Sequence, residues 1–392
     1  MPVGYMFTVF CVAVGTLFAL APVRRPQPIS TVSYFLGLAV NELPFFAGIY
    51  WLGISTTLAF AEGDIDSPIA WATVALAAAA ALGLVVVAYQ GWRDRSAIER
   101  AVVDGLGADW RTTIDADLAA GLHHRLPWAR ILFLPFFRRR PDVRRVADLS
   151  YGDAGRRNLL DVYHHRSTPT GAPILIHMHG GHYDSGHKNS QSLPLLYRLA
   201  GHGWVCISAN YRLRPQYQHP DHLIDFKKVI AWAREHAHEY GADPSTVFVA
   251  GSSAGGHMAA LAALTQNDPA YQPGFADADT SVSAAVLLNG WYRTYFDNSP
   301  ESAPAYHITA DAPPFFLAHG GKDTLVPLSH ARELADHLRR VSTAPVVYAE
   351  MKGAHHAFDL YHSLRFEAVV DAIEAFAARV RSRERAGQRE AR

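Results

Sequence analysis

Cysteine is scarce in this sequence. Cys11 and Cys206 are the only two among 392 residues, so neither a disulfide framework nor a cysteine-based zinc site is indicated. An excess of basic charge is also missing, because 36 lysines and arginines balance 36 aspartates and glutamates. Proteins that bind nucleic acids usually have such an excess. We therefore expect no nucleic-acid partner.

Charge of either sign is missing from three long stretches near the N-terminus, residues 1–23, 43–61 and 67–92. A membrane-spanning helix needs about 20 mainly apolar residues, and a helix that is apolar on all sides has no face to present to water. We therefore predict a membrane segment over residues 1–92 with about three spanning helices: residues 3–22, a second that ends near Ala61, and residues 69–90. Membrane lipids are the partners that this implies.

Two points about these stretches need interpretation. The first stretch has the length of a secretory signal peptide as well, but it lacks a basic leading region and a clear cleavage site before Arg24. The second predicted span, which ends near Ala61, is interrupted by Asn41, Glu42 and Pro44. Because a break there would leave pieces too short to span, we interpret it as one kinked span with Glu42 near an interface.

The arginines suggest an orientation for these helices. Arg24 and Arg25 follow the first stretch, Arg93 and Arg95 follow the third, and the acidic loop EGDIDS (62–67) separates the second from the third. Positively charged flanks favour the cytoplasmic side of a membrane. We expect a multi-pass membrane protein with its N-terminus outside and everything after residue 92 on the cytoplasmic side.

Residues 93–145 form a connecting region. A helical pattern, DRSAIERAVVDGL, precedes the aromatic block LPWARILFLPFF, and five arginines follow at positions 138, 139, 140, 144 and 145. One interpretation places residues 126–145 on an anionic membrane surface, with rings in the interface and guanidinium groups near headgroups. The other makes the block a cap on the following domain. Both interpretations stay open at this point.

From about residue 146 to residue 382, short β-branched runs alternate with helical stretches. The predicted strands are VADLSYG, NLLDVYHH, APILIHMHGG, WVCISANYRL, TVFVAGSS, SAAVLLNG, PFFLAHGG and PVVYAEMKG. Apolar runs without polar alternation are typical of strands buried on both faces, and alternation with helices indicates an α/β domain with a mostly parallel, eight-stranded sheet. The charged tail, residues 383–392, is expected to be disordered.

One strand ends in a candidate nucleophile. VFVAGSSAGGHM (247–258) contains Gly-x-Ser-x-Gly with Ser253 at its centre, between a buried strand and a helix. In such an elbow the serine takes a strained conformation, and small neighbours let strand and helix approach. A serine hydroxyl needs a base held by a third group. Asp323 and His356 follow later strands in the order serine, acid, histidine.

The strand ILIHM leads into His179-Gly180-Gly181. Backbone amides of Gly180 and Gly181, with the amide of Ala254 after the nucleophile, suit an oxyanion hole. Metal chemistry is not indicated, because the histidine pairs at 123–124 and 164–165 have no carboxylate or cysteine partner at ligand spacing. We expect no metal and no organic cofactor.

The chain from about Asp148 to Arg379 resembles α/β-hydrolases of the hormone-sensitive-lipase-like esterase/lipase group. The matching stretches are HGG (179–181), YRLRP (211–215), GSSAGG (251–256), HGGKDTLVP (319–327) and HHAF (355–358). The resemblance implies the following roles: Ser253 as nucleophile, His356 as general base, Asp323 as the acid that orients it, and the amides of Gly180, Gly181 and Ala254 as the oxyanion hole. His355 is then a loop residue.

Two departures from that group affect the substrate. His182 stands where relatives often have a third glycine, and Ser252 stands where they often have an acid. Both leave the triad possible and put the shape of the acyl pocket in doubt. The short connection at residues 291–313 leaves little room for a lid, so a cover must come from the region before residue 146.

These features together predict a membrane-anchored serine carboxylic-ester hydrolase that acts through an acyl-enzyme, on a small-molecule or lipid ester of lipophilic character. Within enzymes, the alternatives are a serine peptidase of the prolyl-oligopeptidase type and a prenylcysteine-methylesterase-like hydrolase. From another class, the alternative is a catalytically silent hydrolase fold that serves as a membrane interaction module.

Overall fold

A single sheet forms the centre of the α/β domain that we predicted over residues 146–382, and we keep its predicted name, the catalytic domain, below. The computed structural model describes residues 3–122, 125–297 and 299–390. Within these residues eight strands pair in the order β1-β2-β4-β3-β5-β6-β7-β8. Their bounds are β1 Val143–Ser150, β2 Leu159–His165, β3 Ala172–Met178, β4 Val205–Ala209, β5 Ala242–Ser252, β6 Ala284–Leu288, β7 Phe315–Gly320 and β8 Val346–Met351.

The sheet is mostly parallel. Pairs β1·β2 and β2·β4 are antiparallel, and the pairs from β4 to β8 are parallel. Each predicted strand run overlaps one of these strands, although β1 and β5 begin three and four residues before the predicted runs. Strands β3, β4, β6 and β7 are buried along their whole length. The fold class predicted from the β-branched runs is therefore confirmed.

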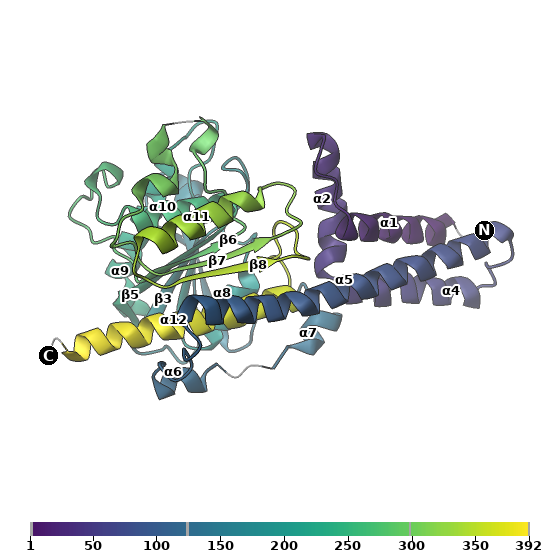
Figure 1. Ribbon diagram of the computed structural model, residues 1–392, viewed down its shortest axis with the longest axis horizontal. Helices are drawn as coiled ribbons and strands as arrows, with labels where there is room; N and C mark the ends of the chain where they lie inside the picture. The colour runs from purple at the N-terminus through teal and green to yellow at the C-terminus, as the bar shows by residue number, and fades with distance from the viewer. Residues whose placement is uncertain (1–2, 123–124, 298, 391–392) are drawn as a thin grey trace.

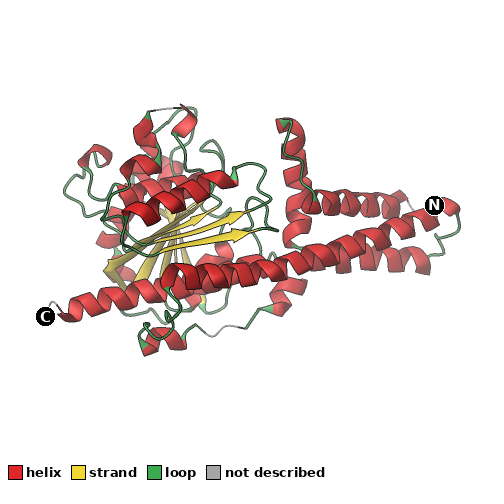
Figure 2. Ribbon diagram, viewed as in Figure 1, coloured by secondary structure: helices red, strands yellow, loops and turns green. Residues whose placement is uncertain are grey.

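Helices cover both faces of this sheet (Figures 1 and 2). The hydrophobic core on one face includes side chains of α9 (Asp221–Glu235), α10 (Ala254–Leu264) and α11 (Leu328–Val341). The core on the other face includes side chains of α8 (Leu193–Gly201), α12 (Leu364–Glu390) and the C-terminal part of α5 (Pro68–Leu106). Shorter elements are α6 Ala116–Ala120, α7 Trp128–Phe133, and the 3-10 turns η2 Gly155–Asn158, η3 Ala237–Tyr240, η4 Pro269–Tyr271, η5 Tyr295–Asp297, η6 Pro300–Ser302 and η7 Pro304–His307.

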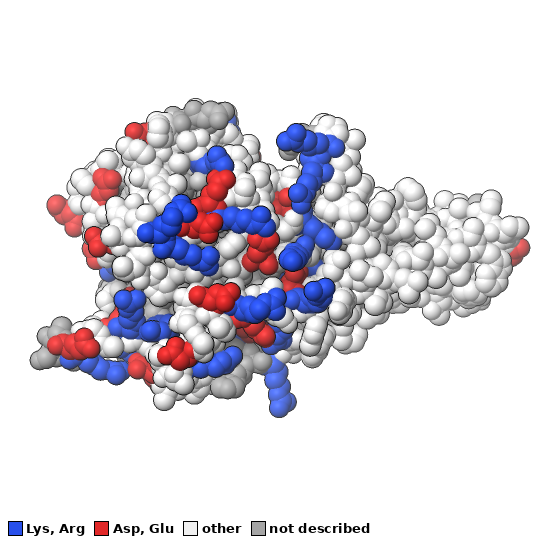
Figure 3. Space-filling model, in the orientation of Figure 1, with Lys and Arg blue, Asp and Glu red and all other residues white. Residues whose placement is uncertain are grey.

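The N-terminal helices form an apolar bundle that projects from the catalytic domain (Figure 1). The elements are α1 Val3–Leu20, α2 Gln27–Glu42, α3 Pro44–Phe46, the π-helix η1 Ala47–Ile54, α4 Ser55–Ala61 and α5. Among the described residues, three helical segments are long and apolar enough to cross a membrane: Val3–Leu20, Pro44–Ala61 and Pro68–Leu106. Figure 3 shows almost no charged side chain on the projecting part, apart from its far end. We call these three segments the apolar bundle below.

The second predicted span is different from our interpretation. The helix breaks at Leu43, where φ is −120° and ψ is 46°, so the prediction of one kinked helix through Glu42 is wrong. Pro44 disfavours a helical conformation of the residue before it. Residues 44–61 then continue as an uninterrupted 18-residue segment. The piece after the break is therefore long enough to be a candidate span, and α2 is a separate helix.

The third candidate span and the following helical pattern form one helix. α5 contains 39 residues, which corresponds to about 58 Å at the usual rise per residue. Its C-terminal half contributes Ile98, Ala101 and Val102 to the core beneath the sheet. The boundary that we predicted at residue 92 therefore lies inside a continuous helix that joins the apolar bundle to the catalytic domain.

The charged tail is helical rather than disordered over residues 383–390, where it continues α12. Arg385 NH1 lies 2.9 Å from Asp117 Oδ2 and 3.2 Å from Asp115 Oδ2. These ion pairs hold the helix against the segment that follows α5. The local sequence pattern does not reveal them, because their partners lie far apart in the chain. Residues 391–392 lie outside the described part of the chain.

The aromatic block before the arginines contacts the base of the apolar bundle. The ring centroid of Phe136 lies 5.3 Å from that of Phe46, and the ring of Trp128 lies 6.3 Å from that of Phe45. Several side chains of this block are nevertheless exposed, namely Trp128, Phe133, Leu134, Phe136 and Phe137. The block therefore lies where the bundle meets the catalytic domain.

Candidate active site

Ser253 occupies a strained turn between β5 and α10. Its φ is 55° and its ψ is −117°, a conformation that residues other than glycine rarely adopt. The neighbouring glycines are required by space: a Cβ on Gly251 would lie 2.1 Å from the Gly255 carbonyl oxygen, and one on Gly255 would lie 2.1 Å from that of Met178. The Ser253 amide donates to Leu288 O at 2.8 Å. The turn has the geometry expected for a nucleophile elbow.

Asp323 and His356 form a direct pair at the neighbouring strand ends. The distance from His356 Nδ1 to Asp323 Oδ2 is 2.6 Å. The second carboxylate oxygen, Oδ1, accepts hydrogen bonds from the amides of Leu325 and Val326, each at 2.8 Å. His319 Nε2 lies 3.3 Å from Asp323 Oδ2. Because Nδ1 of His356 is held by the acid, Nε2 is the nitrogen left for a reacting group.

Charge in this pair opposes the effect of burial. Burial raises the pKa of Asp323, but the charge of His356 and hydrogen bonds from His319 and His356 outweigh it, so the pKa lies below its ordinary value. Burial lowers the pKa of His356, but the charge and hydrogen bond of Asp323, together with the charge of Asp359, raise it above 6.5. Asp323 therefore stays ionised and stabilises the protonated form of His356.

One cavity of about 670 Å³ brings the predicted site residues together. Its lining comes from α2, from the loops after β3, β6 and β7, from the elbow and from the histidine loop: Thr31, Tyr34, Phe35, Gly181, His182, Tyr183, Ser185, Gln191, Ser253, Ala254, Trp291, Tyr295, Phe296, Leu325, Val326 and His356. Ser253 and His356 thus face the same space. The many aromatic side chains make much of its wall apolar.

The wall formed by α2 was only partly expected. The sequence indicated that a cover must come from before residue 146, and α2 is in that region. It did not identify Tyr34 or Phe35. The Tyr34 ring centroid lies 6.0 Å from that of His356, and Tyr34 and Leu38 pack against Ala357. The aromatic block at 126–137 provides no residue of this lining, which disfavours the interpretation of that block as a cap over the site.

The three predicted oxyanion donors differ from one another in their surroundings. Gly181 and Ala254 line the cavity. The amide of Gly180 instead donates to Gln191 Oε1 at 2.5 Å. In this conformation Gly180 is therefore occupied by a side chain of the protein.

Ser252 is fully buried and belongs to a polar network beneath the elbow. Its hydroxyl donates to Asp359 Oδ2 at 2.6 Å, and the Ser192 hydroxyl donates to the same oxygen at 2.6 Å. Asn289 Nδ2 donates to Asp359 Oδ1 at 3.4 Å, and His177 Nε2 lies 3.1 Å from Ser252 Oγ. Ser252 thus links these elements. The sequence analysis did not identify Asp359. An acid in the otherwise apolar run after His356 was the available signal.

His355, expected to be a loop residue, lies in the loop after β8 and contacts the end of α1. Its Nε2 is 3.2 Å from Ala19 O, and burial lowers its pKa to about 4. It is therefore a neutral contact to the apolar bundle at neutral pH.

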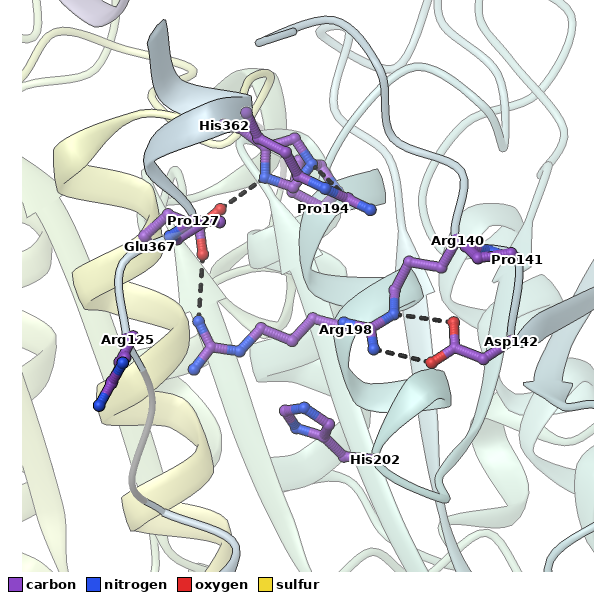
Figure 4. Close-up of a pocket in the computed structure, with 11 residues that line it drawn as sticks. Arg125, Pro127, Arg140, Pro141, Asp142, Pro194, Arg198, His202, His362 and Glu367 are labelled. Atoms are coloured by element: carbon purple, nitrogen blue, oxygen red, sulfur yellow. Dashed lines mark hydrogen bonds and ion pairs between the residues drawn. The ribbon is translucent and has the colours of Figure 1, made fainter. Parts of the chain in front are cut away.

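A second cavity of about 510 Å³ lies between α7, α8 and α12 and has no lining residue in common with the first. Figure 4 shows Glu367 between His362 and Arg198, and Arg140 paired with Asp142. The distances are 2.5 Å from His362 Nδ1 to Glu367 Oε1 and 3.1 Å from Arg198 NH1 to Glu367 Oε2. The carboxylates thus neutralise much of its basic charge.

The histidine pairs at 123–124 and 164–165 are not predicted to be metal ligands. Within the described residues, no group of three or more histidine, cysteine or acidic side chains is arranged to hold a metal ion. His123 and His124 lie outside those residues.

The sheet, the elbow and the acid–histidine pair define an α/β-hydrolase. The BD-FAE family model matches residues 160–286 and 270–338. "Probable carboxylic ester hydrolase LipM" of Mycobacterium tuberculosis (strain ATCC 25618 / H37Rv) is 37% identical over 421 residues, which cover 98% of this chain and 95% of that protein. "Esterase LipQ" of the same organism is 37% identical over 311 residues, 71% of this chain and 73% of that protein.

Among solved structures, a "Truncated form of carbohydrate esterase from gut microbiota" has a similar fold, with a TM-score of 0.50 at 20% identity over 59% of this chain and 96% of that chain. The relatives extend the similarity to nearly the whole length of the protein. The chain belongs to the esterase/lipase family of α/β-hydrolases and is a carboxylic ester hydrolase.

Proposed function

We propose that the protein is a membrane-anchored serine ester hydrolase that cleaves lipophilic esters through an acyl-enzyme. The observation that carries the proposal is the strained Ser253 turn on the same cavity as the Asp323–His356 pair. The largely aromatic and aliphatic wall supports a lipophilic substrate, because apolar contacts hold most of a ligand's surface in such pockets. The apolar bundle supports the anchoring.

The proposed reaction has two halves. His356 Nε2 takes the hydroxyl proton as Ser253 Oγ bonds to the ester carbonyl carbon, and the carbonyl oxygen becomes an oxyanion. The proton passes to the alcohol oxygen as the carbon–oxygen bond breaks, which leaves the acyl-enzyme. Water then loses a proton to His356 and attacks the acyl carbon, and the acid leaves as Ser253 regains its proton. Asp323 stabilises the protonated imidazole in both halves.

The amides of Gly180, Gly181 and Ala254 are proposed as the oxyanion donors. Gly181 and Ala254 line the cavity, whereas Gly180 joins them only when Gln191 gives up its hydrogen bond. Preorganised donors of this kind stabilise the charge of the transition state.

A p-nitrophenyl ester series of increasing chain length, with purified full-length protein, tests the activity. We expect turnover that favours longer chains and is lost in Ser253→Ala. Matched p-nitroanilide substrates separate an esterase from a peptidase. Labelling by a fluorophosphonate probe that survived Ser253→Ala would rule out this nucleophile, and folded wild-type protein without any ester turnover would favour the silent module.

The catalytic domain is proposed to lie on the cytoplasmic side. The support is the position of arginines 24, 25, 93 and 95 after the first and third candidate spans. A reporter that is active only outside the cytoplasm, fused at the C-terminus, should stay inactive, and its activity would reverse the orientation.

A further inference from the structure

The helix α2 has an inverted distribution of side chains for a helix beside water. Ser30, Ser33, Tyr34 and Asn41 are buried. Ile29, Val32, Phe35 and Leu36 form an apolar stripe on the outside, with exposures of 48%, 51%, 66% and 46%. The spacing of three and four residues places this stripe on one side of the helix. No charged residue occurs between Arg25 and Glu42. A helix with these properties is suited to an interface with lipid.

The inner face of α2 is fixed to the loops that carry the catalytic pair. Arg24 NH2 donates to Gly321 O at 2.9 Å, and the Ser30 hydroxyl donates to Thr324 O at 3.2 Å. At the other end, Ser363 Oγ donates to Glu42 Oε2 at 2.8 Å. Since both ends are held, the apolar stripe faces outward in a defined direction.

The position of α2 relative to the apolar bundle gives that direction a meaning. Figure 1 shows α2 running crosswise to α1, between the bundle and the catalytic domain. If the bundle spans a bilayer, a crosswise helix at its end lies in the plane of the interface. In Figure 1, α7 lies at about the same position as α2 along the long, horizontal axis of the molecule. The exposed aromatic block around α7 is followed by arginines. Aromatic rings and arginines are typical of this level of a membrane.

Phe35 connects the stripe to the active site. It lines the cavity of Ser253 and is also the most exposed member of the stripe. Tyr34, its neighbour, lies inside the cavity beside His356. The edge of the cavity at Phe35 is therefore the part of its wall that belongs to the outward face.

We infer that α2 is an interfacial helix of the bilayer and that esters reach Ser253 from the membrane, past Phe35. The inference rests on the proposed function and names its substrate class: esters whose hydrocarbon chain stays in the bilayer while the carbonyl reaches the nucleophile. The charge-free stripe, the flanking arginines and the aromatic block favour lipid as its occupant.

The test uses full-length protein in phosphatidylcholine vesicles and two substrates, a long-chain fluorogenic ester dissolved in the bilayer and water-soluble p-nitrophenyl acetate. The variant is Ile29→Asp/Val32→Asp, because neither residue lines the cavity. We expect it to lower hydrolysis of the bilayer ester about tenfold, since carboxylates resist the interface, and to leave acetate hydrolysis within about twofold. Val341→Asp, an exposed apolar site on α11, is the matched control and should change neither rate.

Equal rates of variant and wild type on the bilayer ester would overturn the inference, and so would an equal loss on both substrates. Neither result touches the proposed function, which in this assay fails if wild-type protein hydrolyses neither ester.

A direct measurement places the helix. A nitroxide on Val32→Cys in a Cys11→Ser background should be accessible to oxygen and shielded from a nickel chelate, as expected at a lipid surface. Cys206 is buried and does not compete for the label. Access to the nickel chelate would place the stripe in water, and shielding from both reagents would place a second protein on it. Either result would overturn the inference.

Discussion

Ser252 and Asp359 form a buried hydrogen bond next to Ser253, with 2.6 Å between Ser252 Oγ and Asp359 Oδ2. Ser252 ends β5, and Asp359 follows His356 by three residues. The side chain of Asp359 therefore joins the histidine loop to the elbow.

We expect Asp359→Asn to lower activity because it lowers the pKa of His356. The charge of Asp359 contributes to the raised pKa of His356, so its removal should shift the acidic limb of the kcat/KM profile to lower pH. Ser252→Ala is the matched control, because it removes the hydrogen bond and keeps the charge. That variant should lose about 1 kcal/mol of folding stability with an unmoved acidic limb. A limb that stays in place in Asp359→Asn would argue for a purely structural role of the acid.

The wild-type pH profile follows from the same pair. In the proposed mechanism His356 must be neutral to accept the Ser253 proton, so we expect activity above the pKa of His356 and its loss as the pH falls through that pKa. Since that pKa is raised, the loss should begin at a higher pH than the ordinary value of 6.5 predicts. The measurement is kcat/KM with p-nitrophenyl acetate from about pH 5 to about pH 9, a range that brackets the usual titration of histidine. A midpoint below the ordinary value contradicts the assignment.

The acid of the pair should matter for rate more than for binding. Asp323→Asn keeps the size of the side chain but not its charge, so His356 loses its orientation and the stabilisation of its protonated form. We expect kcat to fall by roughly three to four orders of magnitude, as for other orienting acids, with little change in KM. The control is His319→Gln, which contacts the same carboxylate at 3.3 Å and should cost far less. Comparable losses in the two variants would shift the orienting role toward His319.

The junction between the two parts of the protein depends on Arg365. This buried guanidinium lies 2.7 Å from Asp94 Oδ2 on α5 and 3.2 Å from Glu42 Oε1 on α2. Arg365→Met leaves both acids buried without their cation, which typically costs about 3–5 kcal/mol. Arg332→Met removes an exposed pair with Glu350 and should cost at most about 1 kcal/mol. Denaturant unfolding in detergent, followed by circular dichroism, compares the two, and similar small losses would show that the junction does not depend on this cluster.

Local patterns explain what the sequence predicted well. The strands are short apolar runs, and the elbow needs small residues within a few positions of Ser253. Both patterns therefore depend only on residues that are close together in the sequence. Asp323 and His356 were found because they follow strands in a known order. Their 2.6 Å contact was not visible in the sequence, but their place at the sheet edge was.

Features that the sequence did not predict depend on contacts between residues far apart in the chain. Tyr34 and Phe35 look like any apolar helix residues, and only the docking of α2 on the loops around Asp323 and His356 makes them part of the cavity. The break at Leu43 differs from the prediction because that prediction depended on the length of the pieces on either side of a break, which looked too short to span a membrane. Glu42 was expected near an interface. It is instead buried against Arg365, which lies 323 positions away in the chain.

The continuous α5 has a consequence for how the protein meets its substrate. Because α5 runs without a loop from the apolar bundle to the core beneath the sheet, no flexible linker at that point lets the catalytic domain move relative to the bundle. In the proposed membrane setting, Ser253 then stays at one height above the lipid. Encounters become a search in two dimensions, governed by how many ester molecules share the same patch of membrane and how fast they diffuse within it.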